Sequence, residues 1–238
     1  MRGFAFFTAI AIDDRLEYAL CMGNVSALPL FHLYGDPPDD SVFDFIHIET
    51  IASRSSVHDW TIRAHRHRNL FQILLIEKGG GEMSFETATA RFAAPTVILV
   101  PATTAHGFRF TPQVTNGWVV SFTEDVADAL GDQSGEALAR LKAVAVEPIL
   151  PLADVAEAKR LSALCADLHE EDSLAREGYR LAMRGLLALI AIEVVRLAVS
   201  RARSGAVTLS RYDARVDELR RLVDEHFRKE RLISFYAE

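Results

Sequence analysis

The sequence predicts an α+β protein in which a small β-barrel comes first and helices follow. Residues 25–122 are rich in Phe, Val, Ile and Trp, in short runs separated by turn signals such as Gly35–Pro38 and Gly79–Gly81. Many short strands with regular turns are typical of a sandwich or barrel. From residue 123 onward, Ala, Leu, Glu and Arg recur at helical spacing instead. The strands that we expect are Phe43–Ile48, Val57–Ala64, Phe71–Lys78, Gly81–Phe85, Thr96–Val100 and Trp118–Phe122.

Two helices are predicted after the barrel. One begins at Pro151, since proline is tolerated in a first turn, and ends near His169. The other covers about Glu177 to Arg201, and its apolar stripe is wide for a helix that faces one neighbour. Both a dimer seam and packing on the barrel would explain that stripe. It consists of Leu186, Leu187, Ile190, Val194, Leu197 and Ala198.

Composition excludes several classes of protein. The net charge is -7 and the pI is about 5.6, whereas a free-standing DNA-binding domain is normally basic. The cysteines, Cys21 and Cys165, are too few for a disulfide framework or a zinc knuckle, and a reducing cytoplasm is expected. The apolar run Phe4–Ile12 is too short to span a bilayer, which needs roughly 20 residues. We expect a cytoplasmic protein that makes no membrane contact.

Three histidines and a glutamine form the clearest chemical pattern. His65 and His67 are two residues apart, so in a strand they share a face. Gln72 follows on the next expected strand, and His106 lies beyond a proline-containing turn. Side chains on different strands can converge inside a small barrel. Three imidazoles suit zinc, nickel or iron, and we expect a divalent metal as an alternative to histidines that only hydrogen-bond one another or a ligand.

This pattern resembles the two motifs of the cupin fold. Gln72 departs from the pattern, because metal-binding cupins usually have Glu there and a neutral amide contributes no charge. The wider stretch from Phe31 to Phe122 resembles the sensor domain of AraC/XylS-family regulators, nearest to the PobR-like activators of aromatic-acid catabolism. Residues 216–227 and 236–238 resemble the first helix and the start of the second helix of that family's helix-turn-helix unit.

The resemblance implies five segments: an extension that could be disordered (1–27), a cupin-like effector-binding barrel (28–122), a helical dimerisation region (123–203), a linker (204–213) and the start of a truncated helix-turn-helix domain (214–238). It implies a transcription activator, not an enzyme. A helix-turn-helix reads DNA with its second helix. The full-length family member would therefore bind operator DNA, and we expect this chain alone not to.

The implied effector is a small aromatic acid, of the hydroxybenzoate or hydroxyphenylacetate type, and the implied assembly is a homodimer. A carboxylate needs cationic or hydrogen-bonding partners and a ring needs apolar walls. The competing reading is a metal-dependent cupin enzyme, a dioxygenase or isomerase that uses the same histidines. The candidate ligand-binding residues are Trp60, Arg63, His65, His67, Phe71, Gln72, His106, Phe108 and Trp118, with His65, His67, His106 and Gln72 also the candidate metal ligands.

Overall fold

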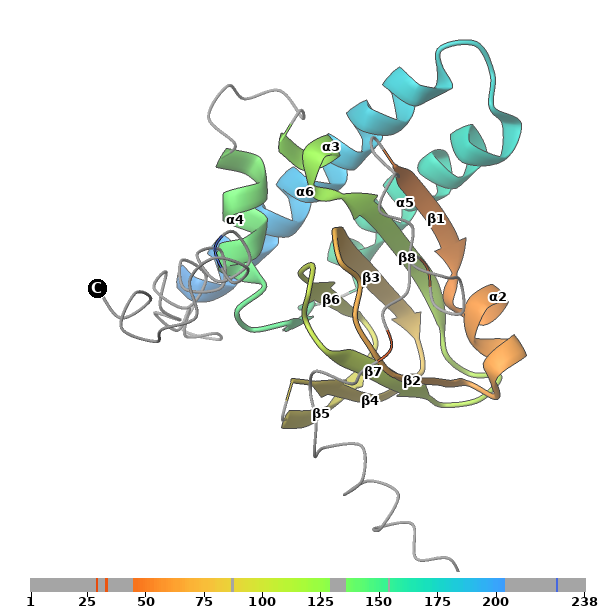
Figure 1. Cartoon of the computed structure of the whole chain (residues 1–238), viewed down its shortest axis with the longest axis vertical. Coiled ribbons are helices and arrows are strands. Elements are labelled where there is room, and N and C mark those ends of the chain that lie inside the picture. Colours follow the sequence, from red (N-terminus) through yellow and green to blue (C-terminus); the bar gives the residue numbers. More distant parts are fainter. Residues whose placement is uncertain are drawn as a thin grey trace, which may run out of the picture.

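Two antiparallel sheets face one another, and helices cover the outer side of the larger one (Figure 1). The computed structural model describes residues 29, 33, 45–86, 88–128, 136–153, 155–203 and 226. The larger sheet has the strand order β1 (Ile46–Thr50), β8 (Asn116–Thr123), β3 (Leu70–Lys78), β6 (Thr96–Val100) and β9 (Ile149–Pro151). The smaller sheet has the order β2 (Thr61–His65), β7 (His106–Phe110), β4 (Gly80–Phe85) and β5 (Ala88–Ala93). Antiparallel sheets followed by helices confirm the predicted α+β class.

Strand β3 shows how the two layers of core arise. Its residues are buried on both faces from Leu70 to Ile76, so alternate side chains enter different clusters. Phe71, Ile73 and Leu75 face the helices. Leu74 and Ile76 face the small sheet, where they meet Met83, Phe92, Phe108 and Phe110. A strand covered on both faces carries apolar residues at nearly every position, and β3 and β6 both have this composition.

The two long helices are α5 (Val155–Leu174) and α6 (Tyr179–Arg203). The predicted stripe of α6 is buried within the domain, since Leu187, Ile190 and Val194 are fully buried in the same cluster as Phe71 and α6 packs against α5 and α4. Packing within the domain therefore accounts for that stripe. The shorter elements are α2 (Ile51–Ser55), η2 (Ser56–His58), α3 (Glu124–Asp128) and α4 (Glu136–Val144).

Two expected boundaries were wrong. Pro151 ends strand β9, where it pairs with Thr96, and helix α5 begins at Val155. Residues 57–60 form part of η2 and a turn, because Asp59 and Trp60 both have positive φ, and β2 begins only at Thr61. The strands β5, β7 and β9 were not among the expected ones.

Several predicted segments lie outside the described residues. These are the extension 1–27, most of 28–44, the linker 204–213 and, apart from His226, the helix-turn-helix segment 214–238. Within the described part of the chain, no helix is both long enough and apolar enough to cross a membrane.

Candidate functional site

Three histidine side chains meet at one end of the space between the sheets. His65 is the last residue of β2, and it pairs with His106, the first residue of β7. His67 follows in the loop that leads to β3, and its carbonyl accepts a hydrogen bond from the backbone N–H of Thr103 in the neighbouring loop. All three histidines are almost completely buried. Loop-to-loop pairing and the β2–β7 register thus bring together the three imidazoles that the sequence predicted to converge.

The imidazoles are close enough to share one small ligand. One nitrogen from each histidine lies within 4.8 Å of the corresponding nitrogens of the others. His65 Nε2 is 3.2 Å from His67 Nε2, and the ring centroids of His65 and His106 are 4.3 Å apart. No carboxylate belongs to this group among the described residues. The cluster is therefore a set of nitrogen donors without an acidic partner.

Backbone carbonyls decide which nitrogen of each ring carries the proton. His65 Nδ1 lies 2.8 Å from the carbonyl oxygen of Arg63, and His106 Nδ1 lies 2.9 Å from that of Thr104. A carbonyl oxygen only accepts, so both Nδ1 atoms must donate. In the neutral rings, Nε2 then carries a lone pair that points into the cluster. This arrangement is the one by which metal-binding histidines are commonly held.

Burial keeps His65 and His106 neutral. Desolvation, followed by the proximity of His67, lowers the pKa of His65 to about 3. Desolvation also lowers the pKa of His106 well below its usual 6.5, with smaller contributions from His65 and His67. A neutral imidazole is the form that binds a metal, so these rings are ready to bind one without first losing a proton.

One nitrogen of the cluster, His106 Nε2, makes no hydrogen bond within the described residues. His67 can donate Nε2–H to His65 Nε2, but His106 Nε2 is buried and has no hydrogen-bond partner within the described residues. An unsatisfied buried acceptor costs roughly 1–3 kcal/mol. A cation among the three nitrogens would give His106 Nε2 a partner. The donor set therefore fits a divalent metal of the kind that prefers imidazole, such as zinc, nickel or iron.

Gln72 lies on the inward face of the larger sheet, close to the same end. It is buried, and its Nε2 donates to Ser121 Oγ at 3.0 Å, directly across the β3–β8 pair. Ser121 was not predicted, although its alternation with the outward-facing Val120 and Phe122 would have placed it on this face. Gln72 as a metal ligand remains a prediction.

The sequence of residues 47–190 matches the family described as the AraC-like ligand binding domain. The chain belongs to this family. Membership indicates an effector-sensing regulator rather than an enzyme, and it agrees with the predicted AraC-type, cupin-like architecture. No curated protein sequence matches the chain.

Two solved structures are similar to this AraC-like ligand-binding domain. One is KdgF from Halomonas sp., with 20% identity over 26% of this chain and 56% of that chain, and a TM-score of 0.25. The other is the AraC-like transcriptional activator CuxR, with 8% identity over 52% of this chain and 43% of that chain, and a TM-score of 0.37. The chain thus spans about half the length of each.

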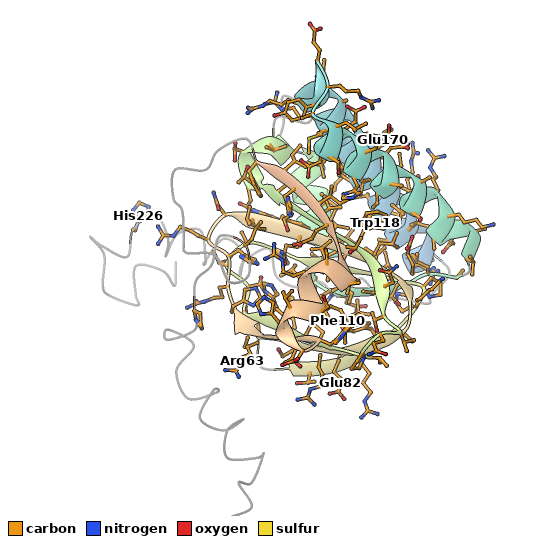
Figure 2. The ribbon with its side chains drawn as sticks, turned by 90° about the vertical axis from the view of Figure 1, so that its right-hand side faces the viewer. Arg63, Glu82, Phe110, Trp118, Glu170 and His226 are labelled. Atoms are coloured by element: carbon orange, nitrogen blue, oxygen red, sulfur yellow. The ribbon has the colours of Figure 1, made fainter. Side chains whose placement is uncertain are left out.

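The prediction that Arg63 faces the pocket was wrong. Arg63 shares strand parity with His65, but the β2–β7 register shifts between Ile62 and His65. Because of this irregularity, Ile62 and His65 are both buried between the sheets, and the alternation of inward and outward side chains breaks between them. Arg63 is exposed and lies at the outer edge of the AraC-like domain (Figure 2). The domain's histidine cluster therefore has no guanidinium from this position.

Phe71 and Trp118 were also wrongly assigned to the pocket. Both face the helices: Phe71 stacks on Phe122, and Trp118 packs against His169 of α5, with ring centroids 5.4 Å apart in each case. Figure 2 shows Trp118 where the sheet meets the helices. Because the larger sheet is covered on both sides, an aromatic residue on it is as well suited to one face as to the other.

Phe108 and Trp60 do pack in the interior between the sheets, as predicted. Phe108 is buried beside His106, with ring centroids 5.9 Å apart, and it stacks on Phe110 at 5.3 Å. Trp60 is half-buried and packs against the same cluster, just before β2. The aromatic wall next to the histidines therefore comes from β7, and Phe110 belongs to it although it was not among the candidates.

The depressed histidine pKa values predict a loss of stability in mild acid. The unfolded chain binds protons at His65 and His106 near pH 6.5, whereas the native state keeps His65 neutral until about pH 3. Below pH 6.5, the free energy of unfolding of the metal-free protein should fall by about 1.4 kcal/mol per pH unit for each such histidine.

Urea unfolding between pH 6.5 and about 5, above the range in which carboxylates titrate, would measure this slope. The variant H65L/H106L should show a much flatter dependence. Equal slopes in the two proteins would contradict the assignment.

Proposed function

We propose that this chain is the effector-binding part of a transcription activator and that its effector is a small aromatic acid of the hydroxybenzoate or hydroxyphenylacetate type. The observation that carries the proposal is the buried cluster of His65, His67 and His106 inside an AraC-like ligand-binding domain. A sensor needs a few polar groups at a defined place in an otherwise apolar interior. The cluster and the aromatic residues of β7 supply that combination.

The two ends of the effector would meet different surfaces. Its ring would pack beside Phe108, which adjoins His106 and continues into the stacked Phe110. Its carboxylate would lie toward the histidines, because Arg63 points away from the interior. An aromatic pair in an offset or edge-to-face arrangement contributes roughly 0.5–1.5 kcal/mol beyond the burial of its area.

Neutral histidines alone are a poor site for a carboxylate. The bare Nε2 of His106 presents a lone pair, which would repel an anion. His65, His67 and His106 would hold a divalent metal, zinc, nickel or iron, and Gln72 is a candidate fourth ligand. When bound, the metal supplies the positive charge that attracts the carboxylate. The three imidazoles would fix its position, and their burial would exclude competing water.

The proposed regulator would couple effector binding to DNA binding. Its partners would be operator DNA, bound by the full-length family member, and a second copy of the chain. An effector can shift such a system only by binding its two states unequally. We propose that the barrel carries this difference in binding, while the DNA-reading helices belong to the family's C-terminal domain.

Effector binding should depend on both the carboxylate and the metal. Calorimetric titration of the zinc-loaded chain with 4-hydroxybenzoate or 4-hydroxyphenylacetate should give binding that 4-hydroxybenzyl alcohol, which lacks the carboxylate, does not match. We expect a difference of about tenfold or more, or at least about 1.4 kcal/mol, because the uncharged alcohol would lose the attraction between the carboxylate and the metal's positive charge. Removing the metal with a chelator should abolish the preference for the acid.

Two outcomes would contradict the proposal. If the acid and the alcohol bind equally well with and without metal, the site does not recognise a carboxylate. If the purified protein carries stoichiometric iron and turns over dihydroxylated aromatic compounds in air, then it is a metal-dependent enzyme and the sensor proposal is wrong.

A further inference from the structure

Glu86 lies just after strand β4, beside the loop that leads to His106. Its backbone N–H donates to the carbonyl oxygen of Ala105 at 2.8 Å, which extends the β4–β7 pairing one residue beyond Phe85 and His106. Its carboxylate accepts a hydrogen bond from the backbone N–H of Ala105, with Oε1 3.4 Å from the nitrogen. In a regular antiparallel pair, a backbone carbonyl would accept that bond. Glu86 thus contacts Ala105 through its backbone and through its side chain.

The loop between β6 and β7 is fixed at two points by residues with unusual backbones. Glu86 has a φ of +51 and Thr103 a φ of +65, in the left-handed region that residues other than glycine seldom adopt. Such a conformation persists only where the surrounding structure requires it. The N–H of Thr103 donates to the carbonyl oxygen of His67 at 2.7 Å, and Glu86 binds Ala105. Thr104 lies between these two points and is buried.

The peptide group that Glu86 contacts is the one that orients His106. The carbonyl of Thr104 and the N–H of Ala105 belong to one planar peptide unit. At one end of this unit, the carbonyl oxygen accepts a hydrogen bond from His106 Nδ1 at 2.9 Å. At the other end, the N–H donates to the carboxylate of Glu86. A single rigid peptide group therefore joins the carboxylate to the imidazole.

We propose that Glu86 is a positioning residue for His106. By holding the peptide between Thr104 and Ala105, it keeps Nδ1 of His106 protonated and leaves the lone pair of Nε2 directed into the histidine cluster. A metal-binding histidine commonly donates its other ring N–H to a carboxylate or to a backbone carbonyl. Here the carboxylate acts through the carbonyl. The inference rests on the proposed function where it concerns the metal, and on the geometry alone where it concerns the tautomer.

The position of the peptide should matter more than its polarisation. A negative charge beside the N–H makes the carbonyl a stronger acceptor, but such cooperativity strengthens a neighbouring hydrogen bond by only roughly 10–30%. Loss of an outer partner of a metal ligand, in contrast, lowers metal affinity by roughly 10–100-fold. A neutral side chain that still accepts the hydrogen bond should therefore replace Glu86 with little loss.

Calorimetric zinc titration of the 238-residue chain tests the proposal. Glu86→Ala should raise the dissociation constant for zinc roughly tenfold, because Ala105 loses its acceptor while all three histidines remain. Glu86→Gln should stay within about threefold of wild type, since its amide oxygen accepts the same hydrogen bond. The matched control is Glu82→Ala, which removes the same charge from β4 where the carboxylate pairs with Arg91 and Arg109. It should leave zinc binding unchanged.

The tautomer of His106 can be measured without any metal. NMR correlation of the ring nitrogens with the ring protons distinguishes the Nδ1–H form from the Nε2–H form. Wild type and Glu86→Gln should hold His106 in the Nδ1–H form, whereas Glu86→Ala should populate both forms. Glu86→Gly, which suits a positive φ, should behave like Glu86→Ala while relieving the backbone. A residue that only stabilises the fold would change the unfolding temperature, followed by circular dichroism, and not the tautomer.

Four outcomes decide the proposal. Zinc binding and a tautomer that both stay as in wild type after Glu86→Ala would overturn it. Glu86→Gln as weak as Glu86→Ala would show that the charge acts and not the position. An equal loss in Glu82→Ala would assign the effect to the general field of the domain. A wild-type chain that binds no zinc would refute the metal in the proposed function, and the NMR comparison would then decide the role of Glu86 by itself.

Discussion

Replacing His106 by leucine should abolish metal binding while leaving the metal-free protein about as stable as before. In the metal-free domain, the variant loses the hydrogen bond from His106 Nδ1 to Thr104 and also removes the unpartnered Nε2. Each contribution is about 1 kcal/mol and they have opposite signs, so the net change should be within roughly 1 kcal/mol. Leucine has a similar volume, which keeps the cavity small.

In the presence of zinc, the two proteins should differ strongly. A ligand that binds only the folded state stabilises it by about 2.7 kcal/mol at 100 times its dissociation constant. Wild type should gain this stabilisation and the variant should not. Loss of an outer-sphere partner alone lowers metal affinity by roughly 10–100-fold, so removal of a ligand should have a larger effect. Calorimetric zinc titration and metal content after dialysis would measure it.

His169→Leu is the matched control. His169 also has a buried nitrogen without a partner among the described residues, but it lies against Trp118 on the helix side of the sheet. Its replacement should leave zinc binding unchanged. If H106L keeps the affinity of wild type, or if H169L loses as much as H106L, then the three-histidine cluster is not the metal site.

Sequence reasoning placed several of the site residues on the buried side. Alternation predicted that His106 and Phe108 share a face, convergence of strands predicted that His65, His67 and Gln72 turn inward, and all five are buried. His67 lies in the loop after β2, so strand alternation alone does not explain its position. The positions of the polar residues could be predicted because histidine and glutamine are unusual within strands that are otherwise apolar. The same reasoning failed at Arg63, where a register shift in β2 ends the alternation, and no residue type in that strand marks the shift.

Other features depend on contacts that sequence patterns do not encode. Trp118 could face either side, because a sheet covered on both sides carries apolar residues at every position. Phe71 adjoins Gln72 in β3, so alternation from an inward-facing Gln72 would have placed Phe71 on the helix side. The carbonyls of Arg63 and Thr104 fix the histidine tautomers, yet any residue has a carbonyl. The α+β class was predictable because the change from alternating to helical periodicity near residue 123 extends over many residues. The histidine tautomers, and the face of the sheet on which a given aromatic side chain lies, each depend on a single contact that no sequence pattern marks.

Replacing Gly117 by alanine should be among the most destabilising single changes in the domain. Gly117 lies in β8 with φ +150, next to the point where the β3–β8 register shifts between Ile76 and Lys78. A side-chain carbon there would lie 1.8 Å from the carbonyl oxygen of Leu75, so the backbone of a central strand would have to move. We expect a loss of about 3 kcal/mol or more in the free energy of unfolding, measured by urea denaturation followed by circular dichroism.

Gly178→Ala separates the two causes of this loss. Gly178 also has a positive φ, +82, but a side-chain carbon there would meet nothing within 4 Å in the described part of the chain. Its replacement should cost only the backbone strain, about 1 kcal/mol. Similar losses in the two variants would show that strain and not the clash dominates at Gly117. A large loss at Gly117 alone matters for the site, because β8 also carries Ser121. A slip of one residue in β8 would turn Ser121 to the helix side and leave Gln72 without its partner.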